Sequence, residues 1–319
     1  MSSTKSDREV WFFTSEIEGE RAGSFRQARW ARVFLDAGAP IRVFNVQGAT
    51  HLTQRAFATS EAFDAFREEC RATARPAASV REGWYVGAVR ALKHIILADF
   101  YLPNILKLLS AVRTLLADGR RVVLFASSPP FALAFAGWLL ASWFPKQVTF
   151  VVDMRDAWAL HTSLGGIKPL KRAIEKMVLR RAAHVSTVSH GLANEFGERY
   201  GVSVDVLYNV ATHYFNPPAA AEVDWLALNP ALTPGRLRFG YTGSSPVGFY
   251  DLGAIARGAV ALSKADPALA DRVQMVFVGA CEEMRREAAA RGVKHDDMAL
   301  FGRVPPKVAS AIHEAADGW

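Results

Sequence analysis

Charged side chains directly follow an apolar, strand-like run in the middle of the chain. Residues 150–152 are Phe-Val-Val, which is typical of a buried strand, and Asp153, Arg155 and Asp156 come next. A carboxylate in such a place can take a proton from a hydroxyl group, and a guanidinium can bind an anionic group. The alternative is structural: Asp153 or Asp156 pairs with Arg155 and caps the next element. We expect Asp153, nearer the strand, to be tied to the backbone or to Arg155, which leaves Asp156 as the better candidate base.

Three other places carry residues suited to binding. Trp158 offers a flat apolar face for a sugar ring or a lipid, although an isolated Trp is more often part of a core. Gly243 and Ser244 leave a strand with small side chains, which let backbone N–H groups and a helix N-terminus approach a phosphate. Near the amino terminus, Gly23 and Arg26 form a second candidate anion site, for which surface solvation is the alternative.

These residues need a scaffold that brings strand ends together. Strand-like and helix-like segments alternate in two series, separated by a proline-rich segment, and this pattern predicts an α/β protein with two doubly wound parallel sheets. Ligands of such sheets bind at the carboxyl ends of the strands. We expect a first domain over residues 1–212, a linker over 213–235 and a second domain over 236–319. The second series stops after three strands, so this domain is predicted to be incomplete.

Two of the expected helices bear on the site. One follows a cap at Ser24 and ends at Gly38. The other spans residues 169–183. Its apolar residues recur at helical spacing and are predicted to form a buried stripe: Leu170, Ile174, Met177 and Val178.

The charge of the chain favours an anionic partner. Its net charge is +7 and its pI is near 9.5, which suit a nucleotide, a phosphorylated lipid or a membrane surface. No nucleic-acid-binding motif occurs, so we expect no nucleic acid partner. Basic residues between 168 and 181, together with the aromatic-rich stretch 84–109, could lie on anionic lipid; a solvated helix face with ordinary core packing is the alternative.

The composition also bears on location. The most apolar run, residues 131–144, is shorter than the roughly 20 residues that a membrane span needs. The polar amino terminus does not resemble a signal peptide, and the two cysteines fit a reducing compartment and lack metal-ligand spacing. We therefore expect a cytoplasmic protein without a metal site, and one that can associate with the inner face of the cytoplasmic membrane.

Several motifs, in this order, resemble one family. Residues 124–158 contain an SPP…D-x-R-D-x-W pattern, and residues 174–196, 204–215 and 238–244 continue the similarity. Together they resemble the bacterial branch of the group 1 (family 4) glycosyltransferases, which have the GT-B fold. Three departures stand out. Val210 replaces the glycine that usually follows Asn209, and the lysine common in the donor phosphate loop is absent between Gly243 and Asp251. The family's E-x7-E element would lie beyond Trp319.

The resemblance implies transfer of a sugar from a nucleotide-sugar donor, with retention and without a metal ion, to a saccharide or lipid-linked acceptor. Such transfer would serve the synthesis of cell-surface polysaccharide or glycolipid. The alternatives are a non-catalytic binding or scaffold protein of the same fold and, less in keeping with the motifs, a sugar epimerase. The resemblance also assigns places to the candidate residues: Gly23 in the loop beside the transferred group, Asp153, Arg155 and Asp156 on the acceptor side, Asn209 between the domains, and Gly243 and Ser244 in the donor phosphate loop.

Overall fold

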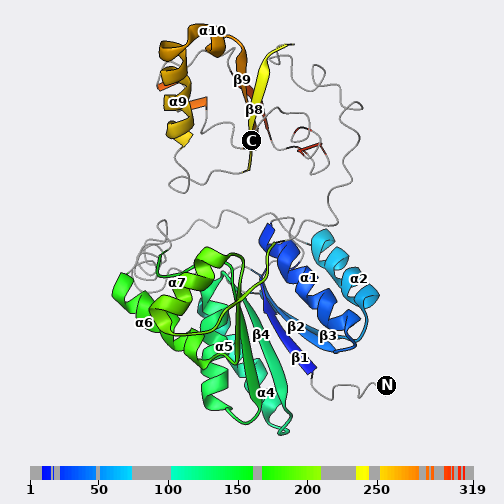
Figure 1. The fold of residues 1–319 in the computed structure, drawn as a ribbon. Coiled ribbons are helices and arrows are strands. Elements are labelled where there is room, and N and C mark those ends of the chain that lie inside the picture. Colours follow the sequence, from blue (N-terminus) through cyan, green and yellow to red (C-terminus); the bar gives the residue numbers. More distant parts are fainter. Residues whose placement is uncertain are drawn as a thin grey trace, which may run out of the picture. The chain divides into compact units, whose positions relative to one another are not determined.

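The chain divides into two compact units, Met1–Asn209 and Val210–Trp319 (Figure 1). The computed structural model describes residues 9–15, 17, 22–47, 51–73, 102–160, 167–209, 235–243, 252–279 and 298–302, with short pieces at 285–286, 289–290, 304, 308–309 and 312. Residues 84–101 of the expected membrane-facing stretch, most of the expected linker and Ser244 lie outside these ranges.

The first unit is built on a seven-stranded sheet with the order β3-β2-β1-β4-β5-β6-β7. Its strands are β1 (Glu9–Thr14), β2 (Ile41–Gln47), β3 (His51–Phe57), β4 (Val122–Ser128), β5 (Val148–Met154), β6 (His184–Thr187) and β7 (Asp205–Val206). Neighbouring strands run parallel, except that β3 is antiparallel to β2. The strand order reverses between β1 and β4, and this switch point is where doubly wound sheets bind their ligands.

Helices cover both faces of this sheet. They are α1 (Ala22–Asp36), α2 (Ser60–Thr73), α4 (Leu102–Leu116), α5 (Phe131–Trp143), α6 (Lys168–Arg181) and α7 (His190–Tyr200). Side chains alternate along β1: Val10 and Phe12 join the apolar cluster under α1 and α2, whereas Trp11 and Phe13 join the cluster under α4 to α7. This two-residue period shows that both faces of the sheet are buried.

Two expected details of the helices are wrong. Helix α1 begins at Ala22, so Ser24 lies within its first turn and is not its cap, although Gly38 does follow its end with a φ of 76°. In α6, Leu170 and Met177 are 37% and 43% exposed. The buried residues are instead Lys171, Ile174, Glu175, Val178 and Leu179. The prediction failed because it used apolarity alone, whereas the helix turns a lysine and a hydrogen-bonded glutamate inward.

Strand β3 was not predicted. His51–Phe57 lacks a regular alternation of polar and apolar residues, because Gln54, Arg55 and Ala56 are all exposed on this edge strand. An edge strand is shielded less than a central one, so its sequence carries a weaker signal.

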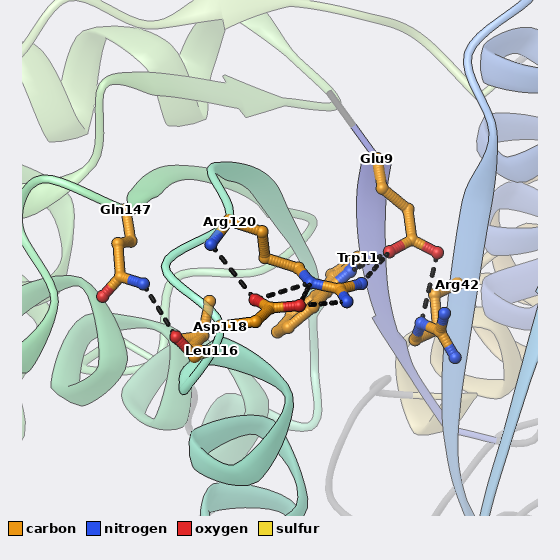
Figure 2. Close-up of polar contacts among 7 residues, drawn as sticks. All are labelled: Glu9, Trp11, Arg42, Leu116, Asp118, Arg120 and Gln147. Carbon is orange, nitrogen blue, oxygen red and sulfur yellow. Dashed lines mark hydrogen bonds and ion pairs between the residues drawn. The ribbon is translucent and has the colours of Figure 1, made fainter. Parts of the chain in front are cut away.

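The amino-terminal edge of the first sheet is held by polar contacts (Figure 2). Glu9, at the start of β1, accepts hydrogen bonds from the indole Nε1 of Trp11 at 2.7 Å and pairs with Arg42 of β2 at 3.1 Å. Arg120, just before β4, lies 3.6 Å from Glu9 and also pairs with Asp118. These contacts join three strands at the edge opposite to their carboxyl ends.

The second unit contains a parallel sheet with the order β10-β9-β8. Its described elements are β8 (Leu237–Gly243), α9 (Leu252–Ala265), α10 (Pro267–Ala270), β9 (Val273–Gly279) and β10 (Met298–Phe301). The three strands are those predicted from the sequence; the short α10 was not expected. The α/β class with parallel sheets is thus confirmed.

We predict that replacing Gly279 destabilises the second unit. Gly279 has a φ of 101° and pairs with Gly243, and a Cβ added to it would lie 2.5 Å from the carbonyl oxygen of Gly243. We expect Gly279→Ala to cost about 1–3 kcal/mol of unfolding free energy, measured by urea denaturation. The control is Gly258→Ala on α9, where nothing lies within 4 Å of an added Cβ. Equal denaturation midpoints for Gly279→Ala and the wild type would contradict the prediction.

Candidate functional site

Three polar side chains lie side by side at the carboxyl ends of the central strands. Ser127 of β4, Asp153 of β5 and Ser186 of β6 are register partners across the sheet. The Ser127 hydroxyl donates to Oδ2 of Asp153 at 3.2 Å, and the Ser186 hydroxyl donates to Oδ1 at 2.8 Å. All three residues are buried. The two serines were missed by sequence analysis, although both occupy the same level as Asp153 at the end of a predicted strand.

The charge partner of Asp153 is Arg26. From helix α1, its Nε donates to Oδ2 of Asp153 at 2.8 Å and its Nη2 donates to Oδ1 at 2.7 Å. The Asp153 side chain is 0% exposed and that of Arg26 7%. The expectation that Asp153 pairs with Arg155 is therefore wrong. Each carboxylate oxygen of Asp153 accepts two hydrogen bonds, and the side chain has no exposed surface. This arrangement suits a residue that positions its neighbours.

Arg26 also reaches the last described residues of the first unit. Its Nη1 donates to the carbonyl oxygen of Leu207 at 2.8 Å and to Oδ1 of Asn209 at 3.1 Å. The structure thus brings three residues singled out in the sequence, Arg26, Asp153 and Asn209, into one hydrogen-bonded network. One guanidinium joins α1, β5 and the segment that follows β7.

Arg155 and Asp156 lie in the turn after β5. The backbone N–H of Arg155 donates to the carbonyl oxygen of Ser128 at 2.9 Å, and its Nη2 donates to the carbonyl oxygen of Pro129. Burial lowers the pKa of Arg155, while the charges of Asp153 and Asp156 act in the opposite direction. Asp156 is exposed. Of the two carboxylates in the motif, Asp156 is therefore the one that a substrate can reach.

Trp158 belongs to the core. It is 3% exposed, and its ring stacks on Phe131 of α5 with a centroid distance of 5.3 Å and an interplanar angle of 20°. Its face is therefore covered by protein, which corrects the suggestion that it stacks on a sugar ring or lipid. Apolar packing between the two rings explains why an aromatic residue follows the charged turn.

Glu175 of α6 binds the backbone at the end of this turn, and sequence analysis did not single it out as a site residue. Its Oε1 accepts hydrogen bonds from the backbone N–H groups of Trp158 at 2.6 Å and Ala159 at 3.4 Å, and its Oε2 accepts one from the hydroxyl of Tyr200 at 2.5 Å. Burial raises the pKa of Glu175, although these hydrogen bonds lower it. Burial likewise raises the pKa of Tyr200, so its hydroxyl remains a donor at neutral pH. The signal in the sequence was an acid within an otherwise basic helix.

Three buried polar atoms beside the turn lack a hydrogen-bond partner within the described ranges. They are Oγ of Ser128, Nε of Arg155 and Nε1 of Trp158. Buried polar atoms normally have a partner, which a bound molecule or an ordered water can supply.

The remaining candidate residues with described positions lie in other elements than the turn after β5. Gly23 lies in the first turn of α1, and Gly243 ends β8 in the second unit. Ser244 lies outside the described residues. Among the residues with described positions, no three His, Cys, Asp or Glu side chains could together hold a metal ion, and no helix is long and apolar enough to cross a membrane.

Residues 24–209 match the model of a protein family described as a glycosyl transferase 4-like domain. The match spans more than half of the chain and includes the whole network around Asp153. The chain belongs to the glycosyl transferase 4-like family. No curated protein sequence matches it. Membership assigns the chain to the glycosyltransferases as a general class.

Solved structures agree with this family in fold. The α,α-trehalose 6-phosphate synthase of Burkholderia multivorans is 12% identical, with a TM-score of 0.57, and the match covers 98% of this chain and 75% of that one. The UDP-forming α,α-trehalose-phosphate synthase of Burkholderia xenovorans is 10% identical, with a TM-score of 0.53 and coverage of 98% and 77%. The MnaA–UDP structure from S. aureus is 12% identical, with a TM-score of 0.48 and coverage of 97% and 72%. The expectation of a GT-B type fold is confirmed.

We predict that Asp153→Asn destabilises this family member strongly. The change leaves the buried Arg26 guanidinium without its counter-charge, and breaking a buried ion pair in this way typically costs about 3–5 kcal/mol. Chemical denaturation of the full chain measures the loss. The matched control is Asp156→Asn, which removes an exposed carboxylate three residues away and is expected to change stability by less than about 0.5 kcal/mol. Equal losses in the two variants would refute the structural role of Asp153.

We predict that Glu175 gives the stability a characteristic pH dependence. Its pKa in the folded protein lies above the ordinary value of 4.5, so the folded state binds the proton more tightly than the unfolded chain. Stability is therefore lost as pH rises from about 4.5 through the raised pKa, by at most about 1.4 kcal/mol per pH unit. Thermal unfolding of Glu175→Gln across this window should show a flatter profile than the wild type. The exposed Glu198→Gln variant on α7 is the control. Parallel profiles for the wild type and Glu175→Gln would contradict this expectation.

Proposed function

We propose that the protein transfers a sugar from a nucleotide-sugar donor to a saccharide or lipid-linked acceptor, with retention of anomeric configuration, in the synthesis of cell-surface polysaccharide or glycolipid. The observation that carries this proposal is the polar edge of the first sheet. Within the matched glycosyl transferase 4-like domain, a buried Arg26–Asp153 pair supports a turn that presents the exposed Asp156.

In this proposal Asp156 acts on the acceptor. The bond between the anomeric carbon and the donor diphosphate breaks, and a bond forms to an acceptor hydroxyl oxygen. The hydroxyl proton goes either to the carboxylate of Asp156 or to the departing diphosphate, in which case Asp156 only orients the acceptor. Arg155, beside it in the same turn, is suited to binding an anionic group of the acceptor. Arg26, Asp153 and Asn209 position this edge without contacting the reacting atoms.

The donor is assigned to the second unit. Gly243 ends β8, and α9 follows from Leu252, so backbone N–H groups and the positive end of a helix dipole can stabilise the charge on the leaving diphosphate. A similarly folded synthase is UDP-forming, which makes UDP and UDP-sugars the first donors to test. We propose that no metal ion takes part and that the protein acts in the cytoplasm, in peripheral contact with the membrane.

Ligand-induced stabilisation tests the donor assignment. We expect UDP or a UDP-sugar to raise the melting temperature of the full chain, because a ligand at 100 times its Kd stabilises by about 2.7 kcal/mol. The same assay with the other nucleoside diphosphates ranks the bases, and EDTA should leave the shift unchanged. An unchanged melting temperature with every nucleoside diphosphate and nucleotide-sugar would remove the catalytic proposal and leave a non-catalytic role.

Turnover of Asp156→Asn tests the acceptor site. If the carboxylate is the base, kcat should fall by about 10²–10⁴, whereas orientation alone should mainly raise KM. The melting temperature should stay unchanged because Asp156 is exposed. The control is Asp118→Asn, the same chemical change at the opposite edge of the sheet (Figure 2). Wild-type kcat and KM in Asp156→Asn would exclude this residue from the reaction.

A further inference from the structure

Tyr208, shortly after β7, carries an exposed aromatic ring on a backbone that is fixed on both sides. The N–H of Leu207 donates to the carbonyl oxygen of Thr187 at 2.8 Å, which continues the pairing between β6 and β7. The carbonyl oxygen of Leu207 and Oδ1 of Asn209 both accept hydrogen bonds from Nη1 of Arg26. Tyr208 itself is 58% exposed. The ring is therefore attached to a fixed backbone and remains open to solvent.

The imidazole of His190 lies against the Tyr208 ring. The two ring centroids are 5.9 Å apart and the ring planes are inclined by 74°, which is an edge-to-face contact. His190 is the first residue of α7 and is also exposed. The preceding Ser189 caps this helix by accepting a hydrogen bond from the N–H of Leu192 at 3.3 Å. Both rings are thus placed by their own elements, so a ligand that binds them loses little free energy in ordering them.

This aromatic pair follows the same row of strand ends as Asp156. Three register partners form the row across neighbouring strands: Met154 of β5, Thr187 of β6 and Val206 of β7. Asp156 and Tyr208 each follow the row by two residues, and His190 follows it by three. Since neighbouring strands lie about 4.8 Å apart, the strands that lead to Asp156 and Tyr208 are about 10 Å apart, roughly the length of two linked sugar rings. A ligand bound at Asp156 that extends along this edge therefore reaches the aromatic pair.

The chemistry of this surface suits a sugar ring better than an acyl chain. A tyrosine ring offers a flat apolar face to the C–H groups of a sugar ring, while its hydroxyl and the imidazole nitrogens of His190 can bond to the hydroxyl groups at the rim. Among the neighbouring residues, Leu207 is apolar and 39% exposed, whereas the exposed Asp205 and Asn209 are polar. An acyl chain needs a continuous apolar surface, which these polar groups interrupt, because covering them without hydrogen bonds costs free energy.

We propose that Tyr208 and His190 bind a sugar ring of the acceptor, the one next to the ring that carries the reacting hydroxyl group. The acceptor is then a saccharide of at least two rings, whether free or linked to a lipid. Tyr208 sets the specificity for this acceptor and does not contact the reacting atoms. The inference rests on the proposed function, in which the reacting hydroxyl lies at Asp156.

Saturation-transfer NMR of the full chain with disaccharide probes tests this subsite without a donor. The probes are disaccharides of glucose, galactose, mannose and N-acetylglucosamine, each compared with its monosaccharide. We expect a disaccharide to bind more tightly than its monosaccharide, and Tyr208→Ala to weaken disaccharide binding about tenfold through loss of the aromatic contact. Tyr208→Phe keeps the ring and should retain most of the affinity. His190→Ala, which leaves the backbone at Tyr208 unchanged, should weaken binding as well.

The matched control is Trp143→Ala, which removes an aromatic residue of similar exposure, 55%, from the end of α5. It should bind disaccharides like the wild type. Equal weakening by Tyr208→Ala and the control would overturn the inference, as would no disaccharide binding by the wild type. So would loss of a UDP-induced rise in melting temperature in Tyr208→Ala, because the ring would then belong to the donor site. Because the NMR samples contain no donor, disaccharide binding that depends on Tyr208 in a chain that transfers no sugar would support the subsite and refute only the proposed function.

Discussion

The ion pair between Arg26 and Asp153 is the contact on which the candidate site depends. Two hydrogen bonds to the carboxylate, together with those from Ser127 and Ser186, fix the carboxyl ends of β4, β5 and β6 relative to α1. The same guanidinium holds Leu207 and Asn209. A buried charge pair of this kind is stable only when each group is fully hydrogen-bonded, and this requirement explains why small hydroxyl side chains flank Asp153.

The turn that carries Arg155 and Asp156 is held from both sides. The ladder between β4 and β5 continues through the bond from Arg155 to Ser128, while Glu175 binds the backbone at Trp158 and Ala159. Stacking of Trp158 on Phe131 packs the segment after the turn against α5. In the motif D-x-R-D-x-W, Asp153 and Trp158 are therefore buried in structural contacts, whereas Asp156 is exposed, and we propose that Asp156 is the residue that acts on the acceptor.

The sequence predicted much of the fold but fewer of the contacts in the candidate site. Apolar runs such as 122–128 and 148–154 alternate with amphipathic segments, so period and order predicted the parallel sheet. The partner of Asp153 could not be predicted, because Arg26 is distant in the chain and Arg155 adjacent. The wrong predictions concern side chains whose type does not decide their burial. Trp158 was a candidate for sugar binding but lies in the core. In α6, Lys171 is buried, whereas the apolar Leu170 and Met177 are exposed.

A double-mutant cycle between Arg26 and Asp153 tests the central claim most directly. The unfolding free energies of the wild type, Arg26→Met, Asp153→Leu and the double variant give the coupling between the two side chains, free of effects that each change has alone. We predict a coupling of about 2–3 kcal/mol, because either single change leaves a buried charge unpaired and the double change leaves none. Additive losses, with a coupling near zero, would show that the pair does not organise this edge of the sheet.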